Sequence, residues 1–515
     1  MVAMSQSNKF YITTPLYYVN DKPHIGHAYT TILADVIARL NIIKGKDVYF
    51  LTGTDEHGQK VQEAANKRNI NCKEHVNEYV MRFESLWKEL NIEFNFFMRT
   101  TFDFHKEKVQ LLLNKLKESG DIYMDEYEGL YSVSEERFVT QKEVDEGSLR
   151  EIITLKEKNY FFKMSKYQKK LIDHIKNNDS FILPISRRNE ILGFLENPLK
   201  DLCISRPKTR LSWGIEIPFD HEYVTYVWFD ALLNYVTAIG WQNNENNFSK
   251  FWPASLHLIG KDILTTHCVY WPTMLLAAGL ELPKTILAHG WWMSNESKMS
   301  KSAGNAVDPL DIIKEHGSDA LRFYLMRNMV VGMDSNYSYE SFVSRYNSDL
   351  ANDYGNLINR ITMLIKKNFQ NEIPAINNLE NLDQELIQKV DEKILTIQES
   401  IDNLKIHDLI ECSISALRLL NKYLEVRAPW KLVKQGTSEI EVAAKTLSVS
   451  ANILILISKI LNPIMPTKTQ LILNIFSVDI KKNYRNLEPL KQIKPNTKLK
   501  NLGKPLFPRI DNVSN

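Results

Sequence analysis

The chain is poor in cysteine, with four among its 515 residues. Cys72, Cys203, Cys268 and Cys412 lie far apart and form no CxxC pair. Neither a disulfide framework nor a thiolate zinc site is therefore predicted. We expect no protein-bound metal and a reducing compartment.

The sequence also lacks a long apolar run. No stretch approaches the roughly 20 apolar residues that span a bilayer, and residues 1–9 are polar, without the apolar segment of a secretion signal. Internal repeats and low-complexity tracts are absent too. These absences predict a globular, cytoplasmic protein.

There is little net charge, because 64 Lys and Arg face 62 Asp and Glu for a formal charge of +2. Affinity for polyanions must therefore come from local patches. One patch lies near the C-terminus, where Glu488 is the only acid among the basic residues Lys481, Lys482, Arg485, Lys491, Lys494, Lys498, Lys500, Lys504 and Arg509. A solvated surface and a nucleic-acid contact both fit this segment.

What the chain does have is alternating strand and helix signals. Residues 10–13 and 47–51 read as strands, and residues 26–40 between them follow the 3.6-residue period of a helix. This order predicts a parallel pair with a right-handed crossover, the unit of a doubly wound sheet. The pattern resumes with a strand at 255–259, a helix at 262–279 opened by an Asp262 cap, and a strand at 285–289.

Two segments depart from this pattern, and 515 residues exceed what one core usually supports. Residues 120–220 are denser in charge and turn residues, with a hairpin expected around Leu130–Val139, and we interpret them as an inserted domain. Beyond residue 346 strand signals fade, and amphipathic helices are predicted at 383–404, 407–426 and 442–461. A helical bundle is the expected architecture there.

A first motif, His24-Ile25-Gly26-His27, follows the first strand where a helix begins. Ligands of doubly wound sheets bind beyond the carboxyl ends of the strands, and helix N-termini favour phosphate. Two histidines can donate hydrogen bonds to phosphoryl oxygens, while Gly26 allows close approach of a nucleotide. Taken alone, the pair also fits two ordinary surface histidines.

A second motif, Lys298-Met299-Ser300-Lys301-Ser302, follows the strand predicted at 285–289. Paired lysines on a loop can close over a triphosphate and offset the charge that develops as pyrophosphate leaves. Alone it fits a solvated basic loop equally well. Each motif follows the end of a predicted strand, and the histidine motif precedes the lysine motif in the chain. We therefore expect folding to bring the histidine pair and the lysine pair to one nucleotide.

Together these motifs resemble the HIGH and KMSKS signatures of class I aminoacyl-tRNA synthetases. Four longer segments resemble the methionine-specific branch of that class, in its zinc-free bacterial type. They are residues 13–20 (TTPLYYVN), 53–58 (GTDEHG), 226–231 (YVWFDA) and 257–263 (HLIGKDI), within a similarity from Phe10 to Trp430 and a matching ending at residues 505–509.

The resemblance implies ATP-dependent activation of methionine and its transfer to the terminal adenosine of tRNA(Met), including the initiator. It implies catalytic roles for His24, His27, Lys298 and Lys301. The implied ATP-binding residues are Asn20, Gly26, Gly260, Asp262, Lys298, Met299, Ser300 and Lys301, with Mg²⁺ accompanying ATP. The implied methionine-binding residues are Leu16, Tyr18, Asp55, Trp228, Ala231, Tyr235, Ile263, His267 and Trp271, with Asp55 holding the substrate ammonium group.

Helical spacing supports this pocket. Ile263, His267 and Trp271 recur every four positions, and Trp228, Ala231 and Tyr235 recur at three and four. Aromatic walls suit a flexible thioether, although such stripes also fit ordinary core packing, and Asp55 also fits a turn beside its glycines. Thr266 departs from the family, in which many members carry a bulky aromatic, so the pocket shape there is an open point.

For the helical half, the resemblance implies that Asn356, Arg360 and Trp430 read the anticodon, by hydrogen bonds and stacking on unpaired bases. Trp430 fits a packing role as well. The implied domains are residues 1–119 and 221–290 for the catalytic halves, 120–220 for the insertion, 291–345 for the KMSKS loop and stem-contact region, and 346–515 for the anticodon-binding bundle.

Zinc-binding members carry CxxC pairs in the insertion, but the matching stretch here reads Tyr131-Ser132-Val133-Ser134-Glu135-Glu136-Arg137. Serine is no substitute for a thiolate ligand, so no zinc is expected. We expect a monomer, because no β-barrel follows the bundle. Two alternatives are a leucine-type or cysteine-type class I enzyme and a non-catalytic tRNA-binding protein on the same scaffold, and the second would be expected to lose the signature residues.

Overall fold

The computed structural model describes residues 8–132, 137–139, 141–145, 151–294, 297–298, 307–376, 378–479, 487–501 and 503–511. The chain forms two compact units. The first unit comprises Met1–Pro23, Asp47–Ser85 and Glu93–His289, and the second comprises His24–Lys46, Leu86–Ile92 and Gly290–Asn515.

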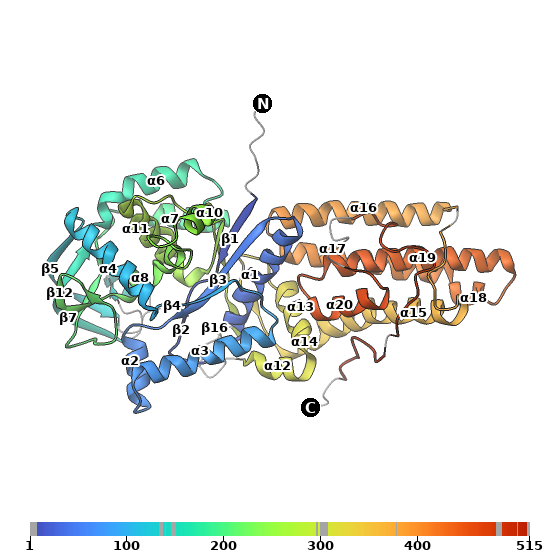
Figure 1. Cartoon of the computed structure of the whole chain (residues 1–515), viewed down its shortest axis with the longest axis horizontal. Coiled ribbons are helices and arrows are strands. Elements are labelled where there is room, and N and C mark those ends of the chain that lie inside the picture. Colours follow the sequence, from blue (N-terminus) through green and yellow to red (C-terminus); the bar gives the residue numbers. More distant parts are fainter. Residues whose placement is uncertain are drawn as a thin grey trace. The chain divides into compact units, whose positions relative to one another are not determined.

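A seven-stranded parallel sheet forms the centre of the first unit (Figure 1). Its strand order is β2-β3-β1-β13-β14-β8, with β4 also paired to β3. The strands are β1 (Lys9–Thr13), β2 (Tyr17–Tyr18), β3 (Asp47–Asp55), β4 (Phe96–Arg99), β8 (Ile182–Leu183), β13 (Leu256–Gly260) and β14 (Ile286–His289). The chain winds outward from β1 in one direction and from β13 in the other, so the topological switch point lies between these two strands. The predicted doubly wound parallel sheet is confirmed.

Helices of four to 18 residues lie between the strands of this sheet in the sequence. They are α2 (Gln59–Lys67), α3 (Cys72–Glu89), α4 (Asp103–Glu118), α8 (Val227–Leu232), α9 (Asn234–Thr237), α10 (Glu245–Phe251) and α11 (Trp271–Ala278). Residues 262–279 do not form the single continuous helix that was predicted. A 3₁₀ turn, η2 (Lys261–Ile263), and a π-helical turn, η3 (Thr266–Tyr270), precede α11, and Asp262 does not cap a helix. Pro272 has no N–H to donate within the first turn of α11, and the Trp271 N–H reaches back five residues to Thr266.

The region between the two halves of the sheet folds into two antiparallel sheets. One has four strands in the order β6-β5-β7-β9 and the other three in the order β10-β12-β11. The expected hairpin is present, because Leu130 in β5 pairs with Val139 in β6. The elements are β5 (Ile122–Ser132), β6 (Arg137–Val139), α5 (Gln141–Asp145), β7 (Ile152–Phe162), η1 (Met164–Tyr167), α6 (Gln168–Asn177), α7 (Ile185–Phe194), β9 (Leu202–Cys203), β10 (Ser205–Pro207), β11 (Glu216–Ile217) and β12 (Asp220–Thr225).

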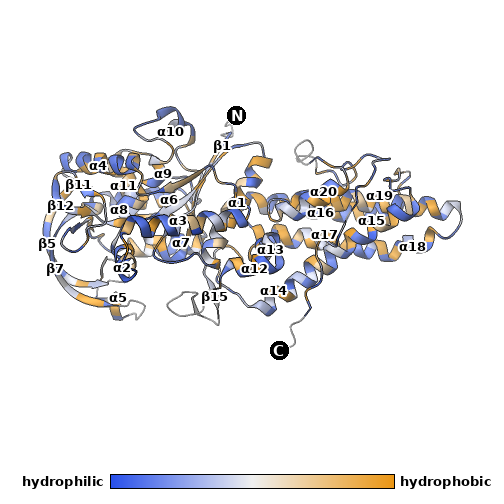
Figure 2. Cartoon of the chain, turned by 60° about the horizontal axis from the view of Figure 1, so that its bottom comes forward, coloured by the Kyte–Doolittle hydropathy of each residue, from blue (hydrophilic) through white to orange (hydrophobic). Residues whose placement is uncertain are grey.

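The second unit is mainly helical, as predicted. Its N-terminal helix is α1 (Ile25–Ile43), and a small sheet contains β15 (Trp292–Ser294), β16 (Ser297–Lys298) and β17 (Ser335–Asn336). The remaining elements are α12 (Pro309–His316), α13 (Ser318–Asn328), α14 (Tyr339–Arg345), the π-helical segment η5 (Tyr346–Gly355), α15 (Asn356–Asn368), α16 (Asn381–Asp402), α17 (Ile406–Arg427), α18 (Pro429–Leu432), α19 (Thr437–Ile460) and α20 (Pro466–Ile475). Hydrophobic and hydrophilic residues alternate along the bundle helices (Figure 2), as expected of amphipathic packing.

Helix α19 is more apolar than expected, since the sequence predicted no apolar stretch long enough to span a bilayer. Its length and a window of mean hydropathy 1.7 would allow it to cross a membrane, but 78% of that window is buried inside the protein. It packs against α17, α18 and α20. This is the environment of the core helix of a bundle.

Candidate active site and nucleic-acid interface

The histidine motif forms the start of α1 as a reciprocal cap. The His24 Nδ1 accepts a hydrogen bond from the Gly26 N–H at 3.0 Å, and the His27 Nδ1 accepts from the His24 N–H at 3.1 Å. Since both Nδ1 atoms accept from the backbone, each neutral ring carries its proton on Nε2. The two rings lie 3.9 Å apart. The motif therefore presents two N–H donors at a helix N-terminus, where an anion is favoured.

The chain on both sides of residues 299–306 is anchored near this helix start. Lys298 pairs with Met293 in the small sheet, and the neighbouring Trp292 contacts the Tyr29 ring of α1, with ring centroids 6.0 Å apart. Beyond that segment, the Val307 carbonyl accepts a hydrogen bond from the Ile25 N–H at 3.4 Å. Met299, Ser300 and Lys301 lie outside the described residues. The second unit thus brings the two ends of the lysine loop to the histidine motif.

Three further residues of the expected ATP set lie in the first unit. Asn20 is exposed in the turn after β2, while Gly260 ends β13 and Asp262 lies in η2. A Cβ on Gly260 would lie 2.5 Å from the Asp262 Oδ1. A larger residue there would therefore displace the Asp262 carboxylate, which folds back over the end of the strand.

Several residues of the expected amino-acid pocket lie at or near the carboxyl end of β3. Asp55 is the last residue of that strand, pairs with Tyr18 of β2, and is 2% exposed. Gly58 follows with a φ of +105°, and a Cβ there would lie 2.1 Å from the Tyr18 hydroxyl and 3.4 Å from the Val227 Cβ. The backbone at Gly58 therefore lets Tyr18 and α8 close on the loop that follows Asp55.

The opposite wall contains Tyr235 and His267, both buried. The His267 Nδ1 lies 3.0 Å from the Ile263 carbonyl, which can only accept, so Nδ1 carries the proton and Nε2 accepts from the Tyr235 hydroxyl at 2.8 Å. Burial lowers the pKa of His267 to about 4, so its imidazole is neutral near pH 7. The Trp228 ring meets His267 edge to face at 6.1 Å. These three side chains form an uncharged aromatic group.

Other expected pocket residues line or support the same walls. Leu16 and Ile263 are partly buried against the core, and Ala231 is buried beside Trp228. Trp271 lies behind Tyr235, at 5.7 Å between rings, and donates its indole N–H to the His257 Nε2 at 3.2 Å. Trp271 therefore fixes Tyr235 from behind. Thr266 is nearly buried at the first position of the π-helical turn.

His257 is a part of this region that the sequence did not indicate individually. Its Nε2 accepts from Trp271, so its Nδ1 donates to the Thr13 hydroxyl at 2.7 Å, and its ring is tilted against that of Tyr235, with the ring centroids 4.3 Å apart. Burial, and to a lesser extent His267, lower the pKa of His257 well below its ordinary value. The only available signal was its position in the segment 257–263, which carries no spacing pattern that points to Tyr235.

In the second unit, the anticodon-reading residues expected from the sequence come together. Asn356 and Arg360 share one face of α15 and line a surface cavity of about 440 Å³. The Arg360 guanidinium lies 4.9 Å above the Trp430 ring. A polar cavity beside a guanidinium stacked on an indole can hold an unpaired base by hydrogen bonds and stacking.

Sequence reasoning missed most of the cavity lining. The additional residues are Asn352, Asp353, Asn359, Met363, Asn421 and Glu425. Asn352, Asn356, Asn359 and Met363 recur at intervals of four, three and four, which marks one helical face. That asparagine-rich stripe was a usable signal, whereas Asn421 and Glu425 come from α17 and depend on tertiary packing.

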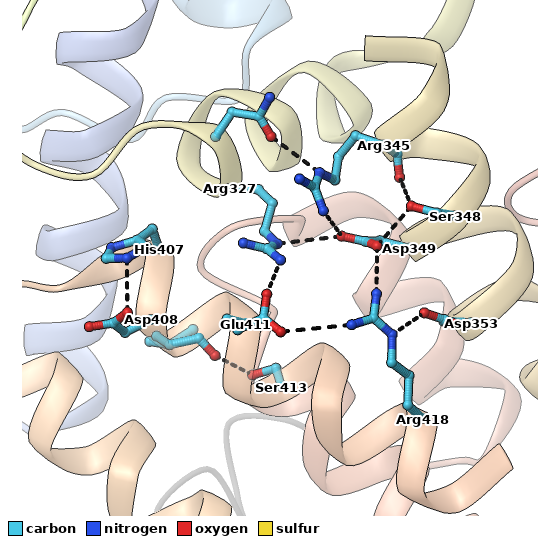
Figure 3. A network of polar contacts seen from close by, with 12 residues as sticks. Arg327, Arg345, Ser348, Asp349, Asp353, His407, Asp408, Glu411, Ser413 and Arg418 are labelled. Atoms are coloured by element: carbon cyan, nitrogen blue, oxygen red, sulfur yellow. Dashed lines mark hydrogen bonds and ion pairs between the residues drawn. The ribbon is translucent and has the colours of Figure 1, made fainter. Parts of the chain in front are cut away.

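The cavity is joined to an ion-pair cluster around a buried carboxylate, the Asp349 network, which comprises Arg327, Arg345, Asp349, Glu411 and Arg418 (Figure 3). Asp349 is fully buried and lies 3.4 Å from both Arg327 and Arg345 and 3.0 Å from Arg418. Arg418 also binds the cavity residue Asp353 at 2.7 Å. The network fixes η5 and α17, which carry cavity residues, to α13 and α14.

No group of three or more His, Cys, Asp or Glu side chains that could hold a metal ion occurs among the described residues. The stretch that would match a zinc site includes residues 133–136, which lie outside them. Lys481, Lys482 and Arg485 of the basic segment also lie outside.

Two family models match the chain. The model described as tRNA synthetases class I (M) covers residues 10–151 and 148–362, and the anticodon binding domain of methionyl tRNA ligase covers residues 373–512.

Curated relatives match nearly the whole chain. The methionine–tRNA ligases of Listeria innocua and Thermotoga maritima are 41% and 42% identical, over 98% of this chain and 79% and 80% of theirs. Among solved structures, Mycobacterium tuberculosis methionyl-tRNA synthetase in complex with methionyl-adenylate is 37% identical, with a TM-score of 0.92 over 97% of this chain and 100% of that chain. The free state of the same enzyme has a TM-score of 0.84 at 34% identity.

Proposed function

Because the chain belongs to the methionyl-tRNA synthetase family of class I, we propose how its own residues carry out the reaction of a methionine–tRNA ligase. This function is supported by about 41% identity over 98% of the chain to an enzyme of that name. The leucine-type and cysteine-type alternatives and the non-catalytic alternative are not favoured. The family match therefore fixes the reaction, and the residue roles below are the proposal.

In the first step, a methionine carboxylate oxygen attacks the α-phosphorus of ATP, and pyrophosphate leaves. We assign Asp55 to the substrate ammonium group and the wall of Trp228, Tyr235 and His267 to the thioether. Leu16, Tyr18, Ala231 and Ile263 complete the pocket, and Trp271 holds Tyr235 in place. The uncharged, fully bonded Tyr235–His267 pair supports this assignment, because a charged wall would oppose burial of an apolar side chain.

His24 and His27 donate hydrogen bonds from Nε2 to phosphate oxygens, while Lys298 and Lys301 offset the charge of the leaving pyrophosphate. Asn20, Gly26, Gly260, Asp262, Met299 and Ser300 complete the nucleotide site. Mg²⁺ bound together with ATP would offset part of the phosphate charge during the release of pyrophosphate. Positioning and charge stabilisation supply the rate, without a covalent enzyme intermediate.

In the second step, a ribose hydroxyl of the terminal tRNA adenosine attacks the adenylate carbonyl, and AMP leaves. Asn356, Arg360 and Trp430 read the anticodon of tRNA(Met), elongator and initiator alike. The protein acts as a cytoplasmic monomer without zinc. Size-exclusion chromatography with light scattering, cell fractionation and elemental analysis test these three statements, and a zinc content near one per chain would contradict the last.

Pyrophosphate exchange measured with each of the twenty amino acids tests the substrate. Methionine is expected to support exchange far better than any other amino acid. Exchange that responds to leucine or cysteine and not to methionine would contradict the assignment.

Arg360→Lys tests the anticodon role. Lysine keeps the charge but loses the planar stacking on Trp430, so the kcat/KM of aminoacylation should fall about tenfold, equivalent to ~1.4 kcal/mol. Methionine-dependent pyrophosphate exchange should stay within about twofold, because it needs no tRNA. Lys367→Arg, at the exposed end of the same helix, is the matched control and should alter neither rate.

A further inference from the structure

A buried carboxylate in the first unit lies between two histidines. Asp230 accepts a hydrogen bond from the His57 Nδ1 at 2.6 Å and another from the His105 Nε2 at 2.8 Å. The His105 Nδ1 is bonded in turn to the Thr237 hydroxyl at 2.8 Å. All four residues are buried.

The proton positions in this group follow from the partners. A carboxylate only accepts, so the imidazole nitrogens that face Asp230 carry protons, and the remaining nitrogen of His105 is hydrogen-bonded to the Thr237 hydroxyl. Burial alone would raise the pKa of Asp230, but the two histidines outweigh burial and hold that pKa below its ordinary value. Asp230 is therefore a buried anion with directional bonds on both oxygens.

Three of the four members are close in sequence to residues of the proposed methionine pocket. His57 follows Asp55 by two residues, and Asp230 lies between Trp228 and Ala231 on α8. Thr237 follows Tyr235 by two residues on α9. The group thus joins the loop after β3, which carries the ammonium anchor, to the two helices that carry the thioether wall.

The same loop has another close approach to α8, because a Cβ on Gly58 would lie 3.4 Å from the Val227 Cβ. The Glu56 side chain points elsewhere, to Arg99 at 2.6 Å on β4. Glu56 therefore fixes the loop to its own sheet, and His57 fixes it to α8.

We infer that Asp230, oriented by His105, is a positioning residue that sets the spacing between Asp55 and the wall of Trp228 and Tyr235, and thereby the affinity for methionine. This inference rests on the proposed function. Stability alone is a poor reason for this group, because a buried ion pair is often no more stabilising than apolar residues of the same volume. Directional bonds that hold two walls of a pocket at a fixed distance are a use that apolar packing does not replace.

His105 is the informative position to change, since its described contacts are with Asp230 and Thr237 and not with the pocket. His105→Phe keeps a ring but removes both bonds. The KM for methionine in pyrophosphate exchange should rise about tenfold, while the KM for ATP and kcat stay within about twofold. His105→Gln places an amide N–H where Nε2 donates, and should return the KM to within about threefold of the unmodified protein.

Two further variants keep the test decisive. Thr237→Val removes only the hydroxyl that orients His105 and should raise the KM for methionine about threefold, even if His105→Phe does not fold. Asp121→Asn is the control, because Asp121 is equally buried in the first unit but binds Lys166 and Tyr167 on η1. It should lower the melting temperature without changing the KM for methionine.

A purely structural role would make His105→Phe or Thr237→Val behave like Asp121→Asn, with a lower melting temperature and an unchanged KM, and would overturn the inference. If the unmodified protein showed no methionine-dependent pyrophosphate exchange, the proposed function would be overturned, and this inference with it. The two failures are thus distinguished by the unmodified protein.

Discussion

At the scale of single residues, the histidines of the first unit show how surroundings decide charge. His267 and His257 face a hydroxyl, a carbonyl and an indole, and burial lowers the pKa of both. His57 and His105 face the carboxylate of Asp230 instead. His257 and His267 are therefore neutral near pH 7, while Asp230 is a buried anion.

The neutral state of His267 predicts an acid sensitivity. Its pKa of about 4 in the folded protein lies below the ordinary 6.5, so between these values the unfolded chain holds one more proton, and unfolding becomes easier as pH falls. One proton corresponds to about 1.4 kcal/mol per pH unit. His267→Gln, whose amide oxygen still accepts from Tyr235, should reduce the slope of unfolding free energy against pH by up to about that amount between pH 6 and 4.5.

Urea unfolding at half-unit pH steps measures this slope, and the difference between the two proteins cancels the contribution of other groups. His221→Gln is the control, because His221 is exposed and should leave the slope unchanged. Parallel slopes for His267→Gln and the unmodified protein would contradict a neutral, buried His267.

The residues of the pocket were predictable in unequal degree. Asp55, Tyr235 and His267 could be named because they lie in segments that resemble a family and recur at helical spacing. His257 and Thr13 touch each other across 244 positions, and no local pattern encodes that contact. The His57–Asp230–His105 group has the same origin, since its members come from three elements.

At the scale of elements, the start of α1 combines a structural and a chemical role in the same side chains. The Nδ1 atoms of His24 and His27 cap the helix, and this leaves the protons on Nε2. A substitution that keeps the helix cap but removes the Nε2 donor can therefore separate the structural role from the proposed contact with phosphate.

His24→Asn makes that separation. Asparagine is a good N-cap and should keep the stability within about 0.5 kcal/mol, whereas His24→Ala loses the cap and about 1 kcal/mol. Both variants lack the Nε2 donor, so pyrophosphate exchange should fall on the order of 100-fold in each. Thermal unfolding and exchange rates measure the two effects. Full exchange activity in His24→Asn would remove His24 from the proposed phosphate contacts.

The elements themselves were predicted from periodicity where the pattern is long. The helices expected at 383–404, 407–426 and 442–461 correspond to α16, α17 and α19 within a few residues. The segment after Gly260 was predicted less well, because the Trp271–Pro272 step produces a π-helical turn that apolar spacing does not reveal. That turn rotates His267 relative to Trp271, so the two do not occupy the equivalent positions that a spacing of four implies.

At the scale of the whole molecule, sequence order did not predict which parts pack together. The helix α1 lies in sequence between two strands of the central sheet, yet it groups with the C-terminal half of the chain. One buried side chain accounts for much of this. Arg322 on α13 binds Asp35 of α1 at 2.6 Å, and the carbonyls of Leu90, Pro463 and Ile464 at 2.7–3.0 Å.

Arg322 is fully buried, and its guanidinium satisfies four acceptors from three separate segments of the second unit. Lysine could keep the ion pair with Asp35 but offers fewer donors in a different geometry, so carbonyls would be left buried without hydrogen bonds. Arg322→Lys should therefore cost about 3 kcal/mol and lower the melting temperature by roughly 5–10 °C. Arg68→Lys is the control, since Arg68 pairs with Glu78 at the surface, where solvent screens the ion pair and lysine can replace arginine at little cost. Differential scanning fluorimetry of both variants measures the contrast, and equal small shifts would mean that other contacts hold α1 to the helical half.

Because α1 carries the histidine motif, a loss of exchange activity in Arg322→Lys below its melting temperature would further indicate that this arginine also maintains the position of the motif.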